Sequence, residues 1–328
     1  MLLFHYPYTL RLVIDQTFET TMTWPVKIIK ISCIFFGTAS LATALFILFD
    51  DTYFNTSFKI DAELAAKFGD FFGGFIGTIF TIFSVILLIY TIISQNLEGS
   101  KNGVCDRFFK MIDYHNENVR NIRIPSIETS KIDIIEEGRR AFVVYKIQLK
   151  RLLQAVEEID KELAANLTDA QKIDIAYMCF YYGLSDTWID FISQKISFHP
   201  GGVVIASMML DKVNACTTYK LGRTNQTDLS SYFRNMYNAI KLIDNDKHLS
   251  ESEKIDLIKI YRAQLSNPEL YILFFNLISR FGSKWNQKGY VEKYELLTNL
   301  PVAYCDGYDP KKYFSMNFEE DEIEPWAN

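Results

Sequence analysis

The chain has 328 residues, of which 49% are hydrophobic and 23% charged, and its formal net charge is −6. This acidity, with no block of lysines and arginines, disfavours direct nucleic-acid binding. The five cysteines are odd in number, scattered and never spaced as CxxC. This pattern is typical neither of a disulfide framework nor of a zinc site. We therefore expect reduced thiols, no metal and no cofactor.

Residues 1–27 carry little interpretable pattern and are expected to form a poorly ordered N-terminal extension. They lack the basic start, short apolar core and small-residue cleavage site of a signal peptide. Met22 lies directly before TWPVKIIK, where a membrane protein could begin. The true start is therefore either Met1 or Met22.

Two uncharged stretches, residues 31–49 and 71–93, are long enough to cross a bilayer core of about 30 Å as helices. They predict a transmembrane hairpin within residues 28–97, with the lipid bilayer as its partner. The link between the stretches is acidic, whereas basic residues flank their outer ends: Lys27, Lys30, Lys101, Arg107 and Lys110. The positive-inside rule then places both termini in the cytoplasm.

Small residues recur along one face of each predicted span. Gly69, Gly73 and Gly77 follow one another at four-residue steps, and Gly37 lies on a similar face of the first span. Because small residues let helix backbones approach closely in lipid, these faces predict helix packing. The alternative, a loop glycine at the membrane edge, fits Gly69 but not Gly77.

Residues 98–300 show helical periodicity almost throughout, so the predicted fold class is all-α, with a cytoplasmic multi-helix domain behind the hairpin. Apolar residues from Phe142 to Leu163 form three heptads of an a/d seam, which fits either a coiled-coil dimer or one helix of an intramolecular bundle. Residues 301–328 lose periodicity, end in an acidic run and are expected to be a solvated, mobile tail.

Helix starts are indicated by three capping patterns. Thr168 with Gln171 and Ser250 with Glu253 have capping-box spacing. Asn267 is expected as an N-cap, followed by Pro268 and Glu269 at the first two helical positions.

Motifs typical of enzymes are mostly absent, including phosphate loops, HExxH, GxSxG and dinucleotide fingerprints. The spacing from Arg107 to His115 is also too long for the Arg–His motif of helical ribonucleases. His115 could still serve as a base or a ligand, but a lone histidine beside Phe and Met is more often a hydrogen-bonded core residue.

A second polar cluster lies at residues 261–270, where one helix ends and another begins. Arg262 and Glu269 form either a buried ion pair that fixes this corner or part of a pocket in which Arg262 binds an anion. We favour the ion pair. Arg234 is similarly a charge within an aromatic helix face.

Several stretches together resemble the phage abortive infection protein family of bacteria. They are FGDFFGGFIGTIFTIFSVILLIYTIISQ, FFKMIDYHNENV, SYFRNMYNAIKLI, YRAQLSNPELYILFFN and EKYELLTNL, in this order from Phe68 to Leu300. The resemblance implies a defence protein of the bacterial inner membrane that arrests or kills the infected cell. It supplies no catalytic site, only motif positions without assigned roles: His115, Asn116, Phe233, Arg234, Arg262, Gln264, Glu269, Asn276, Glu292 and Tyr294.

The favoured interpretation is a sensor or effector without enzymatic activity that perturbs the membrane, with a phage component as its trigger and further copies of itself as partners. One alternative is a membrane-tethered nuclease or nucleotide-processing enzyme that uses His115, Arg262 and Glu269. Another is a scaffold for a partner effector.

Overall fold

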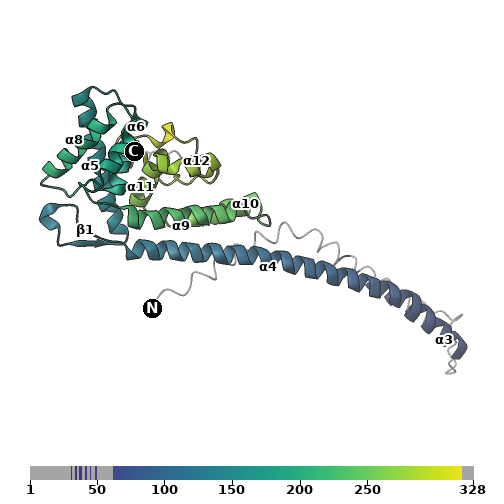
Figure 1. Ribbon diagram of the computed structural model, residues 1–328. Coiled ribbons are helices and arrows are strands. Elements are labelled where there is room, and N and C mark those ends of the chain that lie inside the picture. Colours follow the sequence, from purple (N-terminus) through teal and green to yellow (C-terminus); the bar gives the residue numbers. More distant parts are fainter. Residues whose placement is uncertain are drawn as a thin grey trace, which may run out of the picture. The chain divides into compact units, whose positions relative to one another are not determined.

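The computed structural model describes residues 62–319 and isolated positions between 31 and 49 (Figure 1). These isolated positions are helical: Ile31, Ile34, Gly37, Thr38, Leu41, Ala42, Leu45 and Phe49. The rest of the first predicted span lies outside the described residues, as do residues 1–27, most of the acidic link and the last residues, 320–328. The two-helix hairpin and the choice between Met1 and Met22 therefore stay predictions.

The first of two compact units, Met1–Glu98, contains the second predicted span. Its described elements are α3 (Ala62–Asp70), a π-helical stretch η1 (Phe71–Ile76) and the start of α4 (Gly77–Asn121). One described helix, Ala65–Asn121, is long and apolar enough to cross a membrane, and its most apolar window is not buried within the protein. Such exposed apolar surface is typical of a lipid-facing helix, although length and composition alone do not place it in a bilayer.

Two threonine hydroxyls in this apolar part of α4 bond within the helix itself. The hydroxyl of Thr81 donates to the carbonyl of Gly77, and that of Thr91 to the carbonyl of Leu87, both at 2.8 Å. A Cβ added to Gly37, Gly69 or Gly73 would meet no described atom within 4 Å. The predicted packing face, which also includes Gly77, therefore stays a prediction.

The second unit, Gly99–Asn328, contains the end of α4 and a helical domain. Its helices are α5 (Arg139–Leu163), α6 (Asp169–Tyr182), α7 (Ile189–Ile196), α8 (Gly202–Ala215), α9 (Gln226–Asp244), α10 (Glu251–Arg262), α11 (Asn267–Ile278), α12 (Ser283–Lys288) and α13 (Tyr290–Lys293). Short 3-10 turns complete it: η2 (Thr129–Lys131), η3 (Arg280–Gly282), η4 (Val302–Cys305) and η5 (Pro310–Lys312). The domain is mainly α, as predicted.

Two strands of three residues each are an addition to the predicted all-α fold. β1 (Arg123–Pro125) and β2 (Ile135–Glu137) form an antiparallel ribbon between α4 and α5 (Figure 1). The sequence did not predict them because three residues are too few to show a period of two.

The core is centred on α11, whose side chains from Glu269 to Leu277 are all buried. A helix that is apolar on every side is stable only when other elements surround it. Here α5 and α6 pack against it, and η4 covers it further along. The helix ends at Ile278, and Phe281 lies in η3.

The a/d seam of α5 packs inside the domain. Phe142, Tyr145, Leu149 and Leu152 are each fully buried. This decides between the two predictions for the seam in favour of an intramolecular bundle.

Helix starts follow the predicted capping boxes at two of three places. Thr168 with Gln171 caps α6, and Ser250 with Glu253 caps α10. The third prediction was wrong by one residue, because Ser266 is the N-cap of α11 and Glu269 is therefore its third helical residue rather than its second.

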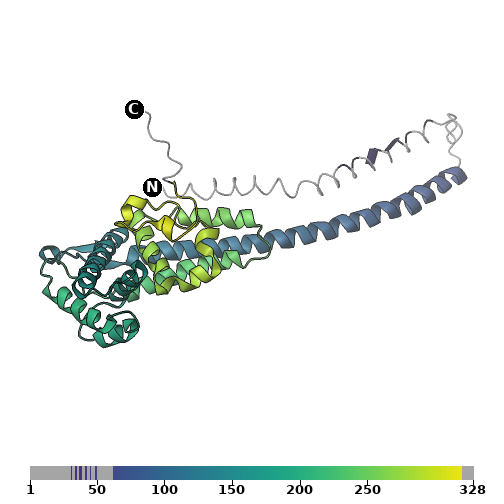
Figure 2. The same cartoon turned by 90° about the horizontal axis from the view of Figure 1, so that it is seen from above.

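The expected tail from residue 301 is partly corrected by the structure. Residues 301–319 fold against the helices, with Cys305, Phe314 and Phe318 buried (Figure 2). Lys146 of α5 also donates to the carbonyl of Tyr304 at 3.0 Å. The prediction failed because it relied on regular spacing of apolar residues. The aromatic residues of this segment are irregularly spaced but still pack against the helices.

Candidate functional site: a buried polar junction

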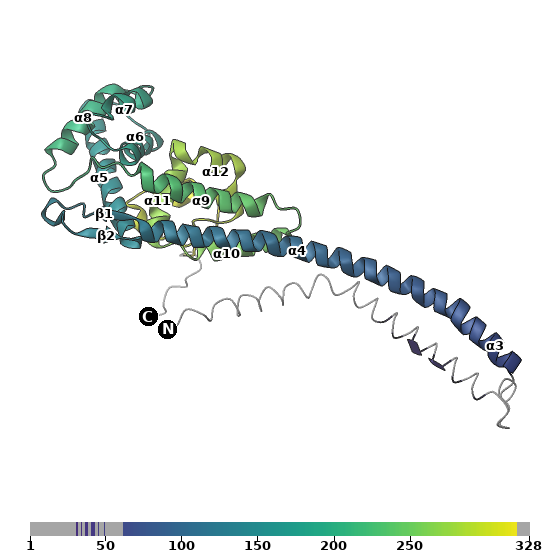
Figure 3. The ribbon, with the colours of Figure 1, turned by 60° about the horizontal axis from the view of Figure 1, so that its bottom comes forward.

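Five segments meet at a cluster of polar side chains, most of them buried, which we call the polar junction; Ser266 is half-buried and Arg139 is exposed. It consists of His115 from α4, Arg139 from α5, Tyr232 from α9, Tyr261 from α10, and Ser266 with Glu269 from the start of α11. His115 lies on the same face of α4 as Phe108, Ile112 and Val119, at helical spacing. The helices α9 and α10 lie beside α4 (Figure 3), and the apolar face of α4 places the imidazole in the core between them.

The imidazole of His115 is held by two tyrosines. Its Nδ1 and the hydroxyl of Tyr261 lie 2.9 Å apart, and the two rings meet edge to face. The ring of Tyr232 lies on another side, with centroids 4.6 Å apart. Nε2 makes no hydrogen bond among the described residues, and Oε1 of Glu269 lies 3.9 Å from it.

The carboxylate of Glu269 has its own partners at the start of α11. Its Oε2 accepts hydrogen bonds from the backbone N–H of Ser266 at 2.9 Å and from the Ser266 hydroxyl at 2.5 Å. Arg139 Nε lies 3.5 Å from the same oxygen, and Arg139 also donates to the carbonyl of Gln264 at 2.6 Å. Glu269 thereby links the helix cap to the start of α5.

Burial shifts the protonation of both titratable groups. It lowers the pKa of His115 to about 4, and the positive charge of Arg139 acts in the same direction. Burial also raises the pKa of Glu269, although hydrogen bonds from Ser266 and the charge of Arg139 act against this. At neutral pH the imidazole is therefore uncharged and has no ion pair with Glu269.

This arrangement favours coupling of helices over catalysis. His115 and Glu269 are each only 1% exposed, so a substrate could reach them only after the helices separate. The enzyme alternative also needed Arg262 beside them. Arg262 instead donates to the carbonyl of Glu295 at 2.8 Å and lies 3.4 Å from the Glu295 carboxylate.

The expected ion pair between Arg262 and Glu269 is therefore wrong. Arg262 lies on α10 and contacts the segment after α13, whereas Glu269 contacts Arg139. Their proximity in sequence suggested a contact, but the turn between α10 and α11 directs the two side chains to different neighbours.

The remaining predicted motif residues are dispersed. Asn276 donates to the Tyr177 hydroxyl at 2.8 Å in the core, and Phe233 is buried. Arg234 is exposed rather than embedded in an aromatic face, and Glu292, also exposed, accepts from the backbone N–H of Ser315. Asn116 and Gln264 border the junction and are half-buried, and the Gln264 carbonyl binds Arg139.

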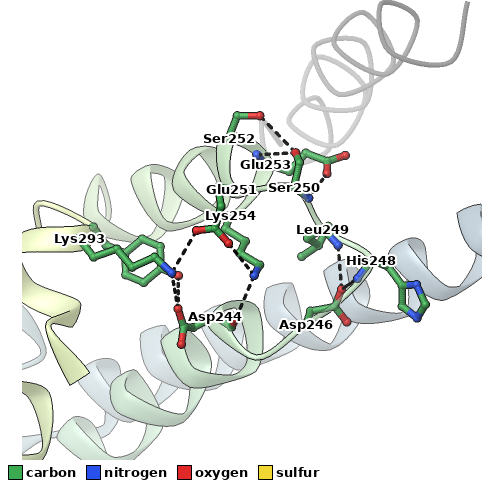
Figure 4. A network of polar contacts seen from close by, with 11 residues as sticks. Asp244, Asp246, His248, Leu249, Ser250, Glu251, Ser252, Glu253, Lys254 and Lys293 are labelled. Atoms are coloured by element: carbon green, nitrogen blue, oxygen red, sulfur yellow. Dashed lines mark hydrogen bonds and ion pairs between the residues drawn. The ribbon is translucent and has the colours of Figure 1, made fainter. Parts of the chain in front are cut away.

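Tyr294 belongs to a separate polar network at the end of α9, in which Figure 4 shows Asp244, Glu251 and Lys293. Asp244 accepts hydrogen bonds from Lys293 at 2.6 Å and from the Tyr294 hydroxyl at 2.7 Å. Lys293 also pairs with Glu251 at 3.1 Å. This network fixes α13 against the turn between α9 and α10.

A second buried cluster of charges was not predicted from the sequence. The carboxylate of Asp174 in α6 binds the Arg280 guanidinium through several hydrogen bonds and His199 Nε2 at 2.9 Å. Burial raises the pKa of Asp174, but the bonds from Arg280 and His199 outweigh it, so that the net shift is downward. These residues lie on three separate segments, and no spacing in the sequence brings them together.

Among the described residues, no group of three or more His, Cys, Asp and Glu side chains is placed to hold a metal ion.

A comparison of the sequence with models of protein families found one match. Residues 224–304 match the model of the family described as "Putative phage abortive infection protein". The family resemblance is confirmed over this segment.

The match supports a role in phage defence. It spans α9 to η4 and therefore includes Tyr232, Tyr261, Ser266 and Glu269 of the polar junction, while His115 and Arg139 lie outside it. No curated protein and no solved structure gave a match.

Proposed function

We propose that this protein is a membrane-anchored phage defence protein that arrests or kills the infected cell by perturbing the membrane, without enzymatic activity of its own. The supporting observation is that α4 is one helix, Gly77–Asn121. Its apolar start is the candidate membrane span, and its end contributes His115 to the polar junction. In this proposal both termini face the cytoplasm of the bacterial inner membrane, and several copies act together after a phage component triggers them.

The polar junction is suited to transmit such a trigger. Buried polar groups with incomplete hydrogen bonding are costly, so a cluster containing one is more easily rearranged than an apolar core. His115 Nε2 is such a group, and it lies on the helix that also carries the apolar stretch. A trigger that moves α10 or α11 would therefore act directly on α4.

Membrane potential in infected cells tests this proposal. A voltage-sensitive dye should report depolarisation before lysis in cells that express the protein. Gly73→Leu combined with Gly77→Leu should abolish the depolarisation because leucine blocks close helix approach. Ile86→Leu, an exposed position in the same helix, serves as the control and should keep it. Failing phage growth at intact potential would contradict membrane perturbation.

A second measurement separates coupling from catalysis at the junction. His115→Ala and Glu269→Ala should lower the stability of the purified protein as well as protection, because each leaves a buried polar group without its partner. An enzyme would instead lose protection at unchanged stability and protein level.

A further inference from the structure

A cavity of about 350 Å³, which we call the α6–α12 cavity, lies between the start of α6, the end of α11, the segment from α12 to α13 and residues 313–314. The Glu292 carboxylate at its rim is already bonded, since it accepts from the backbone N–H of Ser315 at 3.0 Å. Ligand pockets span roughly 300 to 1,000 Å³, so this one has room for a single bulky side chain. Most of its lining is apolar: Ala170, Ile278, Val291, Tyr313 and Phe314, with Asn286, Gly289 and Glu292 beside them.

The chain leaves the described structure close to this cavity. Phe314 lines the cavity, and Glu319 follows five residues later, where its N–H donates to the Thr298 carbonyl at 2.8 Å. Five residues span at most about 18 Å, which limits the distance from Glu319 to the cavity wall. Trp326 is seven residues beyond Glu319, and such a length of chain reaches as far as about 25 Å. The indole of Trp326 can therefore reach the cavity of its own chain.

The terminal segment, residues 320–328, has the sequence EDEIEPWAN, which suits docking through its tryptophan. An indole buries a large apolar area and keeps one polar N–H, so it gains much from an apolar cavity with a polar rim. Pro325 has a fixed φ and favours an extended Glu324, which reduces the entropy lost when Trp326 binds. Trp326 is therefore the side chain of this segment that best fits the α6–α12 cavity.

Charge distinguishes this cavity from a larger one that Tyr313 also lines. Lys284 and Lys288 are exposed on α12, the helix that contributes Asn286 to the α6–α12 cavity. Four acids precede Trp326 in the terminal segment: Glu320, Asp321, Glu322 and Glu324. The larger cavity, of about 550 Å³, is lined by four acids and two lysines: Glu157, Asp169, Asp306, Asp309, Lys150 and Lys312. Of the two cavities, the α6–α12 cavity is therefore the better match for an acidic segment.

We propose that the terminal segment folds back onto its own chain and places Trp326 in the α6–α12 cavity. Its acids then lie toward Lys284 and Lys288, and the indole contacts the apolar wall formed by α6, α11 and Phe314. This contact holds residues 301–319, which precede the segment, against the helices on which they pack. The inference goes beyond the proposed function and does not depend on it.

Fluorine NMR of the full-length protein in detergent micelles tests the proposal, with its four tryptophans replaced by 5-fluorotryptophan. Trp326→Phe removes one line and so assigns it. We expect this line to be broad and displaced from its position in urea, because a docked indole tumbles with the whole protein. Ala170→Glu adds bulk and charge at the cavity, at a position in the first turn of α6 that favours an acid, and should return the line to its narrow form in urea. Ser207→Glu, at an exposed position of α8, is the matched control and should leave the line unchanged.

Three outcomes would overturn the proposal. They are a narrow Trp326 line at the urea position in the unmutated protein, a broad line that Ala170→Glu leaves unchanged, and a broad line that narrows on dilution, which would assign the contact to a second copy. If circular dichroism shows that Ala170→Glu is unfolded, the double variant Lys284→Glu and Lys288→Glu replaces it. This variant repels the acids of the terminal segment and should move the line toward its urea position, and an unchanged line would equally refute the α6–α12 cavity as the site.

Discussion

The two clusters of the helical domain each contain an acid, an arginine and a histidine but differ in how these are bonded. At Asp174, arginine and histidine both bond the carboxylate directly, and the pKa of the acid falls. At Glu269, the histidine lies 3.9 Å away and the arginine 3.5 Å, and the pKa of the acid rises. The comparison shows that direct bonds from an arginine and a histidine outweigh burial at Asp174, whereas the bonds from the neutral Ser266 and a more distant arginine do not outweigh it at Glu269. The first cluster, which we call the clamp, is bonded directly on its carboxylate by both partners, whereas the junction leaves His115 Nε2 without a hydrogen bond among the described residues.

The largest effect should come from breaking the clamp. Asp174→Ala leaves Arg280 and His199 without their partner and should lower the free energy of unfolding by about 3 to 5 kcal/mol. Urea unfolding of the full-length protein in detergent, followed by tryptophan fluorescence, measures this. Asp190→Ala, at an exposed position of α7, is the control and should change stability by less than about 0.5 kcal/mol. A similarly small change for Asp174→Ala would mean that the bonds of Asp174 to Arg280 and His199 do not stabilise the fold.

The second effect is a pH dependence that belongs to the junction. Because the pKa of His115 is about 4 when folded, the unfolded chain takes up a proton near pH 6.5 that the folded chain does not. Stability should therefore fall by about 2 kcal/mol between pH 7 and pH 5. The raised pKa of Glu269 acts in the opposite direction and reduces this loss, while Asp174, with its lowered pKa, loses its contribution only at more acidic pH.

The variant His115→Gln checks this assignment. Glutamine stays neutral and can still accept from Tyr261, so the difference in unfolding free energy between pH 7 and pH 5 should shrink. An undiminished difference would assign the pH dependence to another group.

A smaller effect is expected from Tyr261→Phe. It removes the hydroxyl bonded to His115 and leaves Nδ1 unsatisfied in the core, at a cost of about 1 to 2 kcal/mol. Urea unfolding at pH 7 measures the change, and Tyr114→Phe is a matched control because Tyr114 is 60% exposed on the same helix as His115. Equal effects of the two substitutions would show that the Tyr261 hydroxyl does not stabilise the junction.

The smallest effect distinguishes the junction from the clamp most directly. Glu269→Gln keeps an oxygen acceptor for Ser266 and removes a carboxylate whose charge is disfavoured by burial, so stability should change by less than about 1 kcal/mol. The corresponding Asp174→Asn should cost clearly more, since it weakens a multiply bonded ion pair. Comparable losses in the two variants, measured by urea unfolding at pH 7, would remove the distinction between the clusters.

Local features were predictable from the sequence. The capping boxes at Thr168 and Ser250 depend on residues three apart, and the apolar stretch from residue 71 depends on composition alone. The a/d seam of α5 was visible as well, although the sequence left open whether it packs within the chain or against another copy.

The contacts of the junction were not predictable. Helical spacing shows that His115 lies on an apolar face of α4 but not which helix covers that face. Arg139, Tyr232 and Ser266 carry no pattern that distinguishes them from other polar residues near helix ends. Arg262 was assigned to Glu269 because it is near in sequence, whereas Glu295 is the partner that the fold provides.

The central position of α11 limits which part of this chain can fold on its own. Residues 224–304, which match the family, contain this helix but not α5 or α6, the two helices that enclose it. A fragment limited to the matched segment would expose the apolar residues from Leu270 to Leu277 to water and should be insoluble. The matched segment therefore lacks two helices that cover α11, and a soluble fragment should retain the chain from α4 onward.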